Sequence, residues 1–361
     1  MDRIVKIGII GCGGIANGKH MPSLKNIPNV EMVAFCDIVP TRAEKAKAKY
    51  GTADAKVYTD YKELLKDPEI EVVHVLTPNR EHAQITIDAL YADKHVMCEK
   101  PMAKTAADAR RMVEAAKATG KKLTIGYQHR HKVPADYAKQ YIESGEVGKI
   151  YHANCLATRR RGTPNWGVFL DAEAQGGGPI IDIATHSLDL TLYLMDNYEP
   201  AVVLGKTHKE LEHPEAGNIW GDNGVSTTPL EEAAGAMIVM KNGATILLET
   251  SWALNTDEPV QEGSCVLYGS KAGVSLKNNV LKLKKVQLDR AVNTTVDTSA
   301  GGVAFYSGAS ATPAQTEACR WIKAIVNDTE PLVKPEQACV VSEILEAIYI
   351  SSQTGKAVYF D

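Results

Sequence analysis

The sequence predicts an α/β protein with two domains. Residues 1–127 are expected to form a doubly wound parallel sheet, and residues 128–361 an α+β domain with a large, mostly antiparallel sheet. In the first part, short apolar runs alternate with helical stretches rich in Ala, Lys and Glu, which is typical of parallel strands covered by helices on both faces. From about residue 145 the pattern changes to strands punctuated by glycine, which favours antiparallel pairing.

The elements of the first domain follow from this alternation. The strands are expected at Ile4–Ile10, Met32–Cys36, Val72–Leu76, His95–Cys98 and Leu123–Ile125. The helices are expected at Thr41–Tyr50, Asn79–Tyr91 and Thr105–Thr119.

In the second domain the strand candidates are the segments "GKIYHANCLAT", "GAMIVMKNGATILLETSWAL" and "GSCVLYGSKAGVSL". The "KNG" within the second of these predicts a hairpin turn. One helix is expected near residues 180–195, and two more, near 313–327 and 335–352, close the domain. The stretch "GGVAFYSGASATP" at 301–313 is predicted to be a loop.

Composition narrows the class of protein. The 361 residues carry a formal net charge of −4 and are 44% hydrophobic, which suits a globular protein with ample core. The mild acidity argues against nucleic-acid binding, since such proteins carry a strongly basic face. The seven cysteines are scattered without a CxxC pair, the amino terminus lacks a signal-peptide layout, and no apolar run approaches the roughly 20 residues that span a bilayer. We therefore expect a cytoplasmic protein that binds neither nucleic acid nor membrane.

A glycine-rich segment, "GIIGCGGIA", follows the first predicted strand. Gly11, Gly13 and Ala16 match the pattern G-x-G-x-x-A at the start of a helical stretch. Glycines at this place let the backbone approach a pyrophosphate, which the positive amino end of the helix attracts. A plain strand-to-helix turn has similar glycines, but the position at the first β–α junction favours dinucleotide binding.

The second predicted strand ends at Asp37. A carboxylate there accepts hydrogen bonds from the ribose hydroxyls of the adenosine and repels a 2′-phosphate, so it favours NAD over NADP. A helix-capping role would also suit Asp37, and the nearby Arg42 leaves some tolerance of NADP open.

Two further segments follow strands that end at the same edge of the predicted sheet, where ligands of open α/β sheets bind. In "VLTPNREH", Thr77, Asn79 and His82 are candidates for the nicotinamide side of the cofactor, although an ordinary turn with Asn79 as helix cap explains each residue equally well. In "HVMCEKP", Lys100 follows the strand directly and can stabilise the alkoxide that develops when an alcohol is oxidised. Without this context the segment would be a solvated loop.

In the second domain, "QGGGPIIDIATHSLDLTLYLM" places Asp182, His186 and Asp189 four and three residues apart, on one face of a helix. A histidine oriented by a carboxylate one turn away is a ready general base. A capping aspartate and a core histidine are the plain alternative, but the flanking glycines and Lys100 favour the catalytic interpretation. His129 and His131 add potential zinc ligands, yet no compact set of three is evident, so we expect no metal.

The chain resembles the glucose-fructose oxidoreductase/inositol dehydrogenase/MocA (Gfo/Idh/MocA) family over essentially its whole length. The motifs that carry the resemblance occur in the order G-x-G-x-x-A, the second-strand Asp, T-P-N-x-x-H, E-K-P and G-G-x-x-x-D-x-x-x-H-x-x-D. Within it, "RRRGTPNWGVF", "QGGGPIIDIATHSLD" and "LLETSWALN" are similar to bacterial D-glucoside 3-dehydrogenases, including gut-bacterial enzymes that oxidise C- and O-glucosides of flavonoids.

The resemblance implies a Rossmann domain and a catalytic group of Lys100, Asp182 and His186, with the Lys-Pro bond often cis. It also implies a homo-oligomer. The candidate NAD contacts are Gly11, Cys12, Gly13, Gly14, Ile15, Asp37, Arg42, Thr77, Pro78, Asn79, His82, Glu99, Lys100 and Gln128. The candidate substrate contacts are Lys100, Tyr127, Arg159, Asn165, Trp166, Asp182 and His186, of which Lys100, Asp182 and His186 are shared with catalysis.

The expected function is therefore NAD-dependent oxidation of a secondary hydroxyl of a pyranoside, at C3, to the keto sugar. Three alternatives stay open from the sequence. They are a redox-neutral glycosidase or lyase that passes through a transient 3-keto intermediate, a dehydrogenase of inositol or another sugar, and a non-catalytic sensor of NAD and sugar.

Overall fold

The computed structural model describes residues 3–257, 260–298 and 312–361, and in it the chain forms two units. The first unit contains the described residues up to Tyr127 and also those from 312 to Cys339. The second contains the described residues from Gln128 to 298 and Val340–Asp361. The sequence analysis assigned residues 312–339 to the second domain, so the structure differs here.

The first unit is built on a parallel sheet, which confirms this half of the predicted fold class. Its strands are β1 (Val5–Ile10), β2 (Val30–Cys36), β3 (Lys56–Tyr58), β4 (Val72–Val75), β5 (His95–Cys98) and β6 (Leu123–Ile125), in the order β3-β2-β1-β4-β5-β6. All five pairings are parallel. The order reverses between β1 and β4, which makes the carboxyl ends of these two strands the expected ligand-binding edge.

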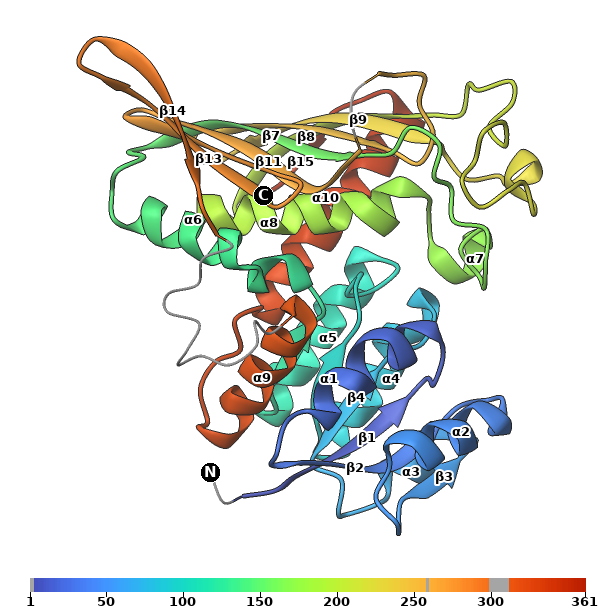
Figure 1. The fold of residues 1–361 in the computed structure, drawn as a ribbon. Coiled ribbons are helices and arrows are strands. Elements are labelled where there is room, and N and C mark those ends of the chain that lie inside the picture. The colour runs from blue at the N-terminus through green and yellow to red at the C-terminus, as the bar shows by residue number, and fades with distance from the viewer. Residues whose placement is uncertain (1–2, 258–259, 299–311) are drawn as a thin grey trace. The chain divides into compact units, whose positions relative to one another are not determined.

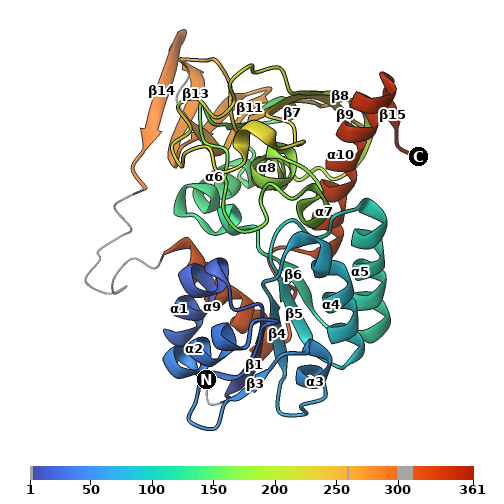
Figure 2. The same cartoon turned by 90° about the vertical axis from the view of Figure 1, so that its right-hand side faces the viewer.

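Helices cover both faces of this sheet (Figure 2). On one side lie α1 (Met21–Lys25), α2 (Pro40–Tyr50) and α9 (Pro313–Val326), and on the other α4 (Asn79–Tyr91) and α5 (Ala106–Thr119). The short helix α3 (Tyr61–Leu65) follows β3. Local signals set the helix ends: the Thr105 hydroxyl accepts a hydrogen bond from the Asp108 N–H at the start of α5, and Gly120, with φ of +65°, ends it.

Helix α9 joins the first unit because its apolar face completes that unit's core. Trp321, Ile322 and Ile325 of α9 are buried in one cluster with Met21 and Leu24 of α1. The sequence predicts a helix at this place and assigns it to the second domain. The apolar face of such a helix can be buried in either unit, so its periodicity does not tell which core it covers.

The second unit has a nine-stranded sheet. Its strands are β7 (Ile150–Thr158), β8 (Pro200–His208), β9 (Ala233–Met240), β10 (Thr245–Ser251), β11 (Gln261–Gly269), β12 (Ala272–Lys277), β13 (Val280–Gln287), β14 (Arg290–Val296) and β15 (Val358–Tyr359). The order is β14-β13-β12-β11-β7-β10-β9-β8-β15, and only the β7–β10 pair is parallel. The predicted mostly antiparallel sheet is confirmed, as is the hairpin at "KNG", where Gly243 has φ of +85°.

Helices α6 (Val133–Glu143) and α8 (Thr185–Met195) pack on one face of the nine-stranded sheet (Figure 1). The remaining helical segments are η1 (Ala16–His20) in the first unit, η2 (Gln128–His131), α7 (Ala172–Gln175), η3 (Ile180–Ala184) and η4 (Val225–Thr227) in the second, and α10 (Pro335–Thr354) across the division at residue 339. The predicted helix near 180–195 forms, but its first turn, η3, is a π-helix. The loop predicted at 301–313 lies, up to residue 311, outside the described residues. Within the described part of the chain, no helix is long and apolar enough to cross a membrane.

Candidate active site

The glycine loop after β1 has the shape that a dinucleotide needs. Gly11 has φ of +91°, and a Cβ there would lie 2.6 Å from the carbonyl oxygen of Leu76, so any other residue is excluded. At Gly13 and Gly14, by contrast, an added Cβ would meet no atom within 4 Å. The loop therefore leaves open space in front of its backbone, at the start of a helical segment, and this space fits a pyrophosphate.

Asp37, at the end of β2, is fixed beside this loop. Its side chain is 7% exposed. Oδ2 accepts a hydrogen bond from the Cys12 N–H at 2.9 Å, and Oδ1 accepts one from the Val39 N–H, also at 2.9 Å. Arg42 is an exposed neighbour, with Nη1 3.9 Å from Oδ1. A fixed negative charge next to the cofactor loop is the feature from which the sequence predicts a preference for NAD.

His82 of α4 joins the loops that follow β4 and β5. It is 1% exposed, with Nδ1 2.8 Å from the carbonyl oxygen of Pro101 and Nε2 2.9 Å from that of Thr77. Burial lowers the pKa of His82, although both carbonyls act to raise it, so the neutral ring donates to one carbonyl at a time. The Lys100–Pro101 peptide bond is cis, as the resemblance implied. Both ring nitrogens of His82 face backbone carbonyl oxygens. The contact of His82 with NAD stays a prediction.

Glu99 is the centre of a buried charge cluster that the sequence analysis did not anticipate. Its Oε1 lies 2.7 Å from Lys19 Nζ and 2.7 Å from His20 Nε2, while Lys19 Nζ also lies 2.8 Å from Glu317 Oε2 of α9. The other oxygen, Oε2, accepts a hydrogen bond from the backbone N–H of Lys100 at 3.0 Å. Glu99 thus holds the backbone of the predicted catalytic lysine.

Opposite charges in this cluster stabilise one another against burial. Burial favours the neutral form of Glu99, yet Lys19 and His20 hold its pKa well below the usual range. Burial likewise opposes the charge on Lys19, but Glu317 and Glu99 raise its pKa. Because residues 19, 99 and 317 are far apart in the sequence and share no motif, no local signal could have revealed this cluster.

In the second unit, Asp182 lies in the π-turn η3 and His186 in the first turn of α8. Asp182 Oδ2 accepts a hydrogen bond from Trp252 Nε1 at 3.0 Å and lies 3.6 Å from Arg159 Nη1. The His186 ring packs against that of His129, with centroids 4.9 Å apart and planes tilted by 52°. The spacing argument assumed a regular α-helix, whereas a π-turn inserts a residue at the position of Asp182, as often happens at functional sites.

Asp189, which follows Asp182 and His186 on the predicted helix face, forms an ion pair with Arg130. Both oxygens accept hydrogen bonds from Arg130, from Nε at 2.9 Å and Nη2 at 2.6 Å, and both side chains are fully buried. Burial opposes the charge on Arg130, but Asp189 raises its pKa, so the guanidinium stays charged. This pair fastens η2 to α8, next to His186.

The glycines before η3, which the sequence analysis took as support for the catalytic interpretation, serve packing inside the second unit. A Cβ on Gly177 would lie 2.0 Å from the hydroxyl oxygen of Tyr349, and one on Gly178 would lie 2.6 Å from the carbonyl oxygen of Glu231. The Gly178 N–H and the Tyr349 hydroxyl both donate to Oε1 of Glu231, at 2.9 and 2.6 Å. The glycines therefore admit a buried hydrogen-bond network.

The predicted sugar-pocket residues lie in different surroundings. Arg159 contacts Asp182 and Glu262, and Trp166 is 48% exposed and packs edge-on against Trp220. Asn165 donates to the carbonyl oxygens of Trp220 and Gly221, so its amide connects two loops. Tyr127, in the first unit, is 0% exposed. The substrate contacts of these residues stay predictions. Gln128, a candidate NAD contact, begins η2.

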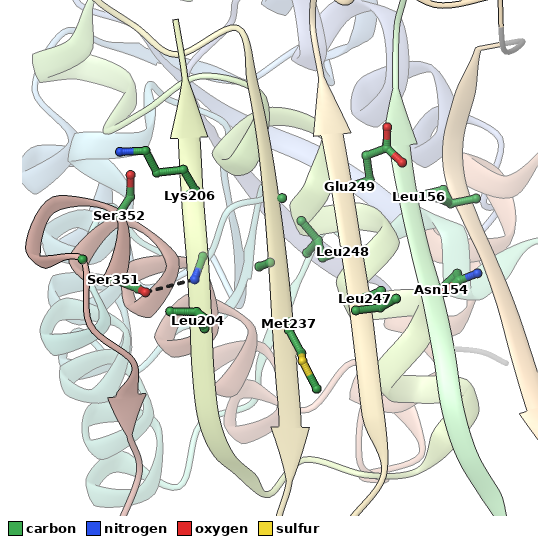
Figure 3. A pocket seen from close by; sticks show the side chains of 14 residues that line it. Asn154, Leu156, Leu204, Lys206, Met237, Leu247, Leu248, Glu249, Ser351 and Ser352 are labelled. Carbon is green, nitrogen blue, oxygen red and sulfur yellow. Dashed lines mark hydrogen bonds between the residues drawn. The ribbon is translucent and has the colours of Figure 1, made fainter.

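A hollow of the second unit lies over strands β7–β10, beside the end of α10 (Figure 3). Exposed Leu204, Met237 and Leu247 project from this open sheet face. No predicted catalytic or sugar-pocket residue is among the described residues that line the hollow. It is therefore separate from the candidate site.

Comparison with known proteins identifies the class. Residues 5–127 match the GFO_IDH_MocA oxidoreductase family with its NAD-binding Rossmann fold, and residues 135–275 match the GFO/IDH/MocA C-terminal domain. The chain belongs to this family, and its first unit is an NAD-binding domain of an oxidoreductase.

Individual relatives agree with this assignment. D-glucoside 3-dehydrogenase of Escherichia coli (strain K12) is 30% identical over 367 residues, which cover 98% of this chain and 97% of that protein. Inositol 2-dehydrogenase of Salmonella typhimurium is 43% identical over 147 residues, 40% of this chain and 43% of that protein.

Solved structures show the same fold. Levoglucosan dehydrogenase, in complex with NADH and levoglucosan, aligns with a TM-score of 0.83 at 22% identity, over 99% of each chain. Aldose-aldose oxidoreductase of Caulobacter crescentus aligns with a TM-score of 0.81 at 22% identity, over 99% of this chain and 100% of that one.

Proposed function

We propose that the protein oxidises a secondary hydroxyl of a pyranoside, at C3 of a glucoside, to the 3-keto sugar with NAD as the acceptor. The observation that carries this proposal is the 30% identity to a D-glucoside 3-dehydrogenase along almost the whole of both chains. A match of that extent includes the substrate unit, whereas the 43% identity to inositol 2-dehydrogenase covers only 40% of this chain.

The chain's residues have distinct roles in this proposal. NAD, when bound, accepts the hydride from the carbon that is oxidised. The imidazole of His186 takes the hydroxyl proton, and the ammonium of Lys100 stabilises the negative charge that develops on the oxygen. Asp182, held by Trp252 and Arg159, supports His186. Glu99 fixes the Lys100 backbone through its N–H.

The cofactor contacts are proposed from the same geometry. The backbone around Gly11, Gly13 and Gly14 accommodates the pyrophosphate, and Asp37 accepts hydrogen bonds from the ribose. Thr77, Asn79 and Gln128 are the proposed contacts of the nicotinamide half.

We also propose a cytoplasmic homo-oligomer. The open sheet face supports self-association, since Leu204, Met237 and Leu247 are 51%, 45% and 45% exposed and large apolar patches are usually covered. Light scattering coupled to size-exclusion chromatography tests this. Met237→Lys should yield a smaller species than the parent, and a parent that elutes as a monomer contradicts the proposal.

Isotopic labelling tests the reaction itself. Methyl glucoside deuterated only at C3 should yield deuterated NADH, whereas label at C1, C2 or C4 should stay in the sugar. NMR of the products should show a 3-keto glucoside, and His186→Ala provides the inactive control. Label transferred from another carbon would contradict the C3 assignment. Release of free sugar without net NADH would instead indicate the redox-neutral alternative.

A further inference from the structure

His129 is in ring contact with the proposed base, although no motif singles it out. Its imidazole lies 4.9 Å from that of His186, centroid to centroid, and its side chain is only 7% exposed. The ring therefore limits the orientations that the His186 imidazole can adopt.

The strand behind His129 is shaped to hold this ring. Gly263 of β11 has φ of +58°, and a Cβ there would lie 1.9 Å from Nδ1 of His129 and 2.1 Å from Cε1. The imidazole thus occupies the place where any other residue's side chain would begin. The pairing of β11 with β7 also shifts register between Gln261 and Ser264, at this glycine.

The backbone on either side of the two rings is fixed as well. Arg130, directly after His129, makes two hydrogen bonds to Asp189, one turn after His186. Since both partners are fully buried, this pair sets the distance between η2 and α8. Three features thus fix the contact between the two rings. They are the register shift in β11, the positive φ of Gly263 and the buried Arg130–Asp189 pair.

We propose that His129 is a positioning residue that holds the imidazole of His186 in the orientation needed to accept the hydroxyl proton. The inference rests on the proposed function, in which His186 is the base. The contact has a second consequence, because two imidazoles this close disfavour the doubly protonated state. His129 therefore helps to keep His186 neutral as the pH falls.

Other charged groups occupy the elements packed around His186, and their contributions stay constant when only His129 is changed. They are Asp182 in η3, Arg130 and His131 in η2, Asp189 in α8, Arg159 directly after β7, Glu262 in β11, and Lys132, Asp136, Lys139 and Glu143 at α6.

Two substitutions separate orientation from charge. His129→Ala removes the ring and should lower kcat with methyl glucoside by about tenfold or more, while KM changes by less than threefold. His129→Phe restores a ring and should recover most of kcat. It should also move the acidic limb of the kcat/KM profile to higher pH by about half a unit or more, because the second imidazole is gone. His152→Phe is the matched control, since His152 packs against Tyr268 in the same unit at 5.2 Å, and it should change neither quantity.

A titration without substrate keeps this test independent of the proposed reaction. The His186 Cε1–H signal, assigned by its loss in His186→Ala, should titrate at higher pH in His129→Phe than in the parent. A kcat within twofold of the parent in a folded His129→Ala protein overturns the positioning role, as does an equal loss in the alanine and phenylalanine variants. An unmoved His186 titration overturns the effect on protonation. If no sugar is oxidised, the proposed function fails, and the titration still decides whether the two rings are coupled.

Discussion

Replacing Lys19 by methionine should destabilise the first unit strongly, because it leaves two buried carboxylates without their shared cation. Lys19 is 8% exposed and lies within 2.8 Å of an oxygen of both Glu99 and Glu317, which are 5% and 4% exposed. Removing one partner of a buried ion pair costs about 3–5 kcal/mol. For a unit of this size each kcal/mol lowers the melting temperature by about 2–4 °C, so we expect a fall of about 10 °C.

Thermal unfolding followed by circular dichroism measures this effect. The control is Lys6→Met, since the Lys6–Glu69 pair is at the surface, with side chains 36% and 54% exposed, and should leave the melting temperature unchanged. The double variant Lys19→Met/Glu317→Leu should regain part of the loss, because one uncompensated charge is gone. A Lys19→Met protein that melts within about 2 °C of the parent would refute the reasoning, as would a double variant whose loss equals the sum of the two single losses.

Four further outcomes follow from the described geometry. The parent should bind NAD at least about tenfold more tightly than NADP, a difference of about 1.4 kcal/mol, and Asp37→Ala should lose this preference in a fluorescence titration. Gly13→Ala, in open space, should keep the parent's melting temperature but bind NAD weakly, whereas equally tight NAD binding would place the pyrophosphate elsewhere. Lys100→Ala and His186→Ala should each lose on the order of 10²-fold in kcat yet bind NAD, and near-normal turnover in both would end the catalytic assignment. Burial lowers the pKa of His95 to about 4, and the neutral ring accepts the Lys122 N–H at Nδ1. The free energy of unfolding should therefore fall as the pH drops below about 6.5 toward 4. The difference in melting temperature between pH 7.5 and pH 5 should be smaller in His95→Gln than in the parent.

Sequence periodicity predicted helices and strands whose burial follows a regular pattern along the chain. It missed a short strand that lacks such a pattern. Asn79–Tyr91 forms a helix with the predicted bounds, and its buried residues, which run from His82 to Leu90, recur at helical spacing. The strand Lys56–Tyr58 was missed, since three partly exposed residues at a sheet edge leave no alternating pattern. The cofactor loop was predicted from a motif, because all the residues of that motif lie within one short segment of the chain.

What the sequence could not predict depends on residues brought together from distant positions. The contact of Lys19 with Glu317 spans most of the chain, and the glycines at 177 and 178 are explained only by Tyr349 and Glu231. The π-turn at Asp182 likewise depends on packing, since the spacing of Asp182 and His186 alone suits a regular helix. The family was identifiable early because its motifs survive in order, whereas the partners of each motif residue required the fold.

The place of α9 in the first unit also bears on the order of folding during synthesis. The sheet of that unit is complete once Ile125 has been made, but Trp321, Ile322 and Glu317, which cover its core and balance Lys19, are translated some two hundred residues later. At about 5–20 residues per second, the nascent unit waits roughly 10–40 s with an apolar flank uncovered. On the ribosome, this apolar flank should therefore stay exposed until helix α9 has emerged.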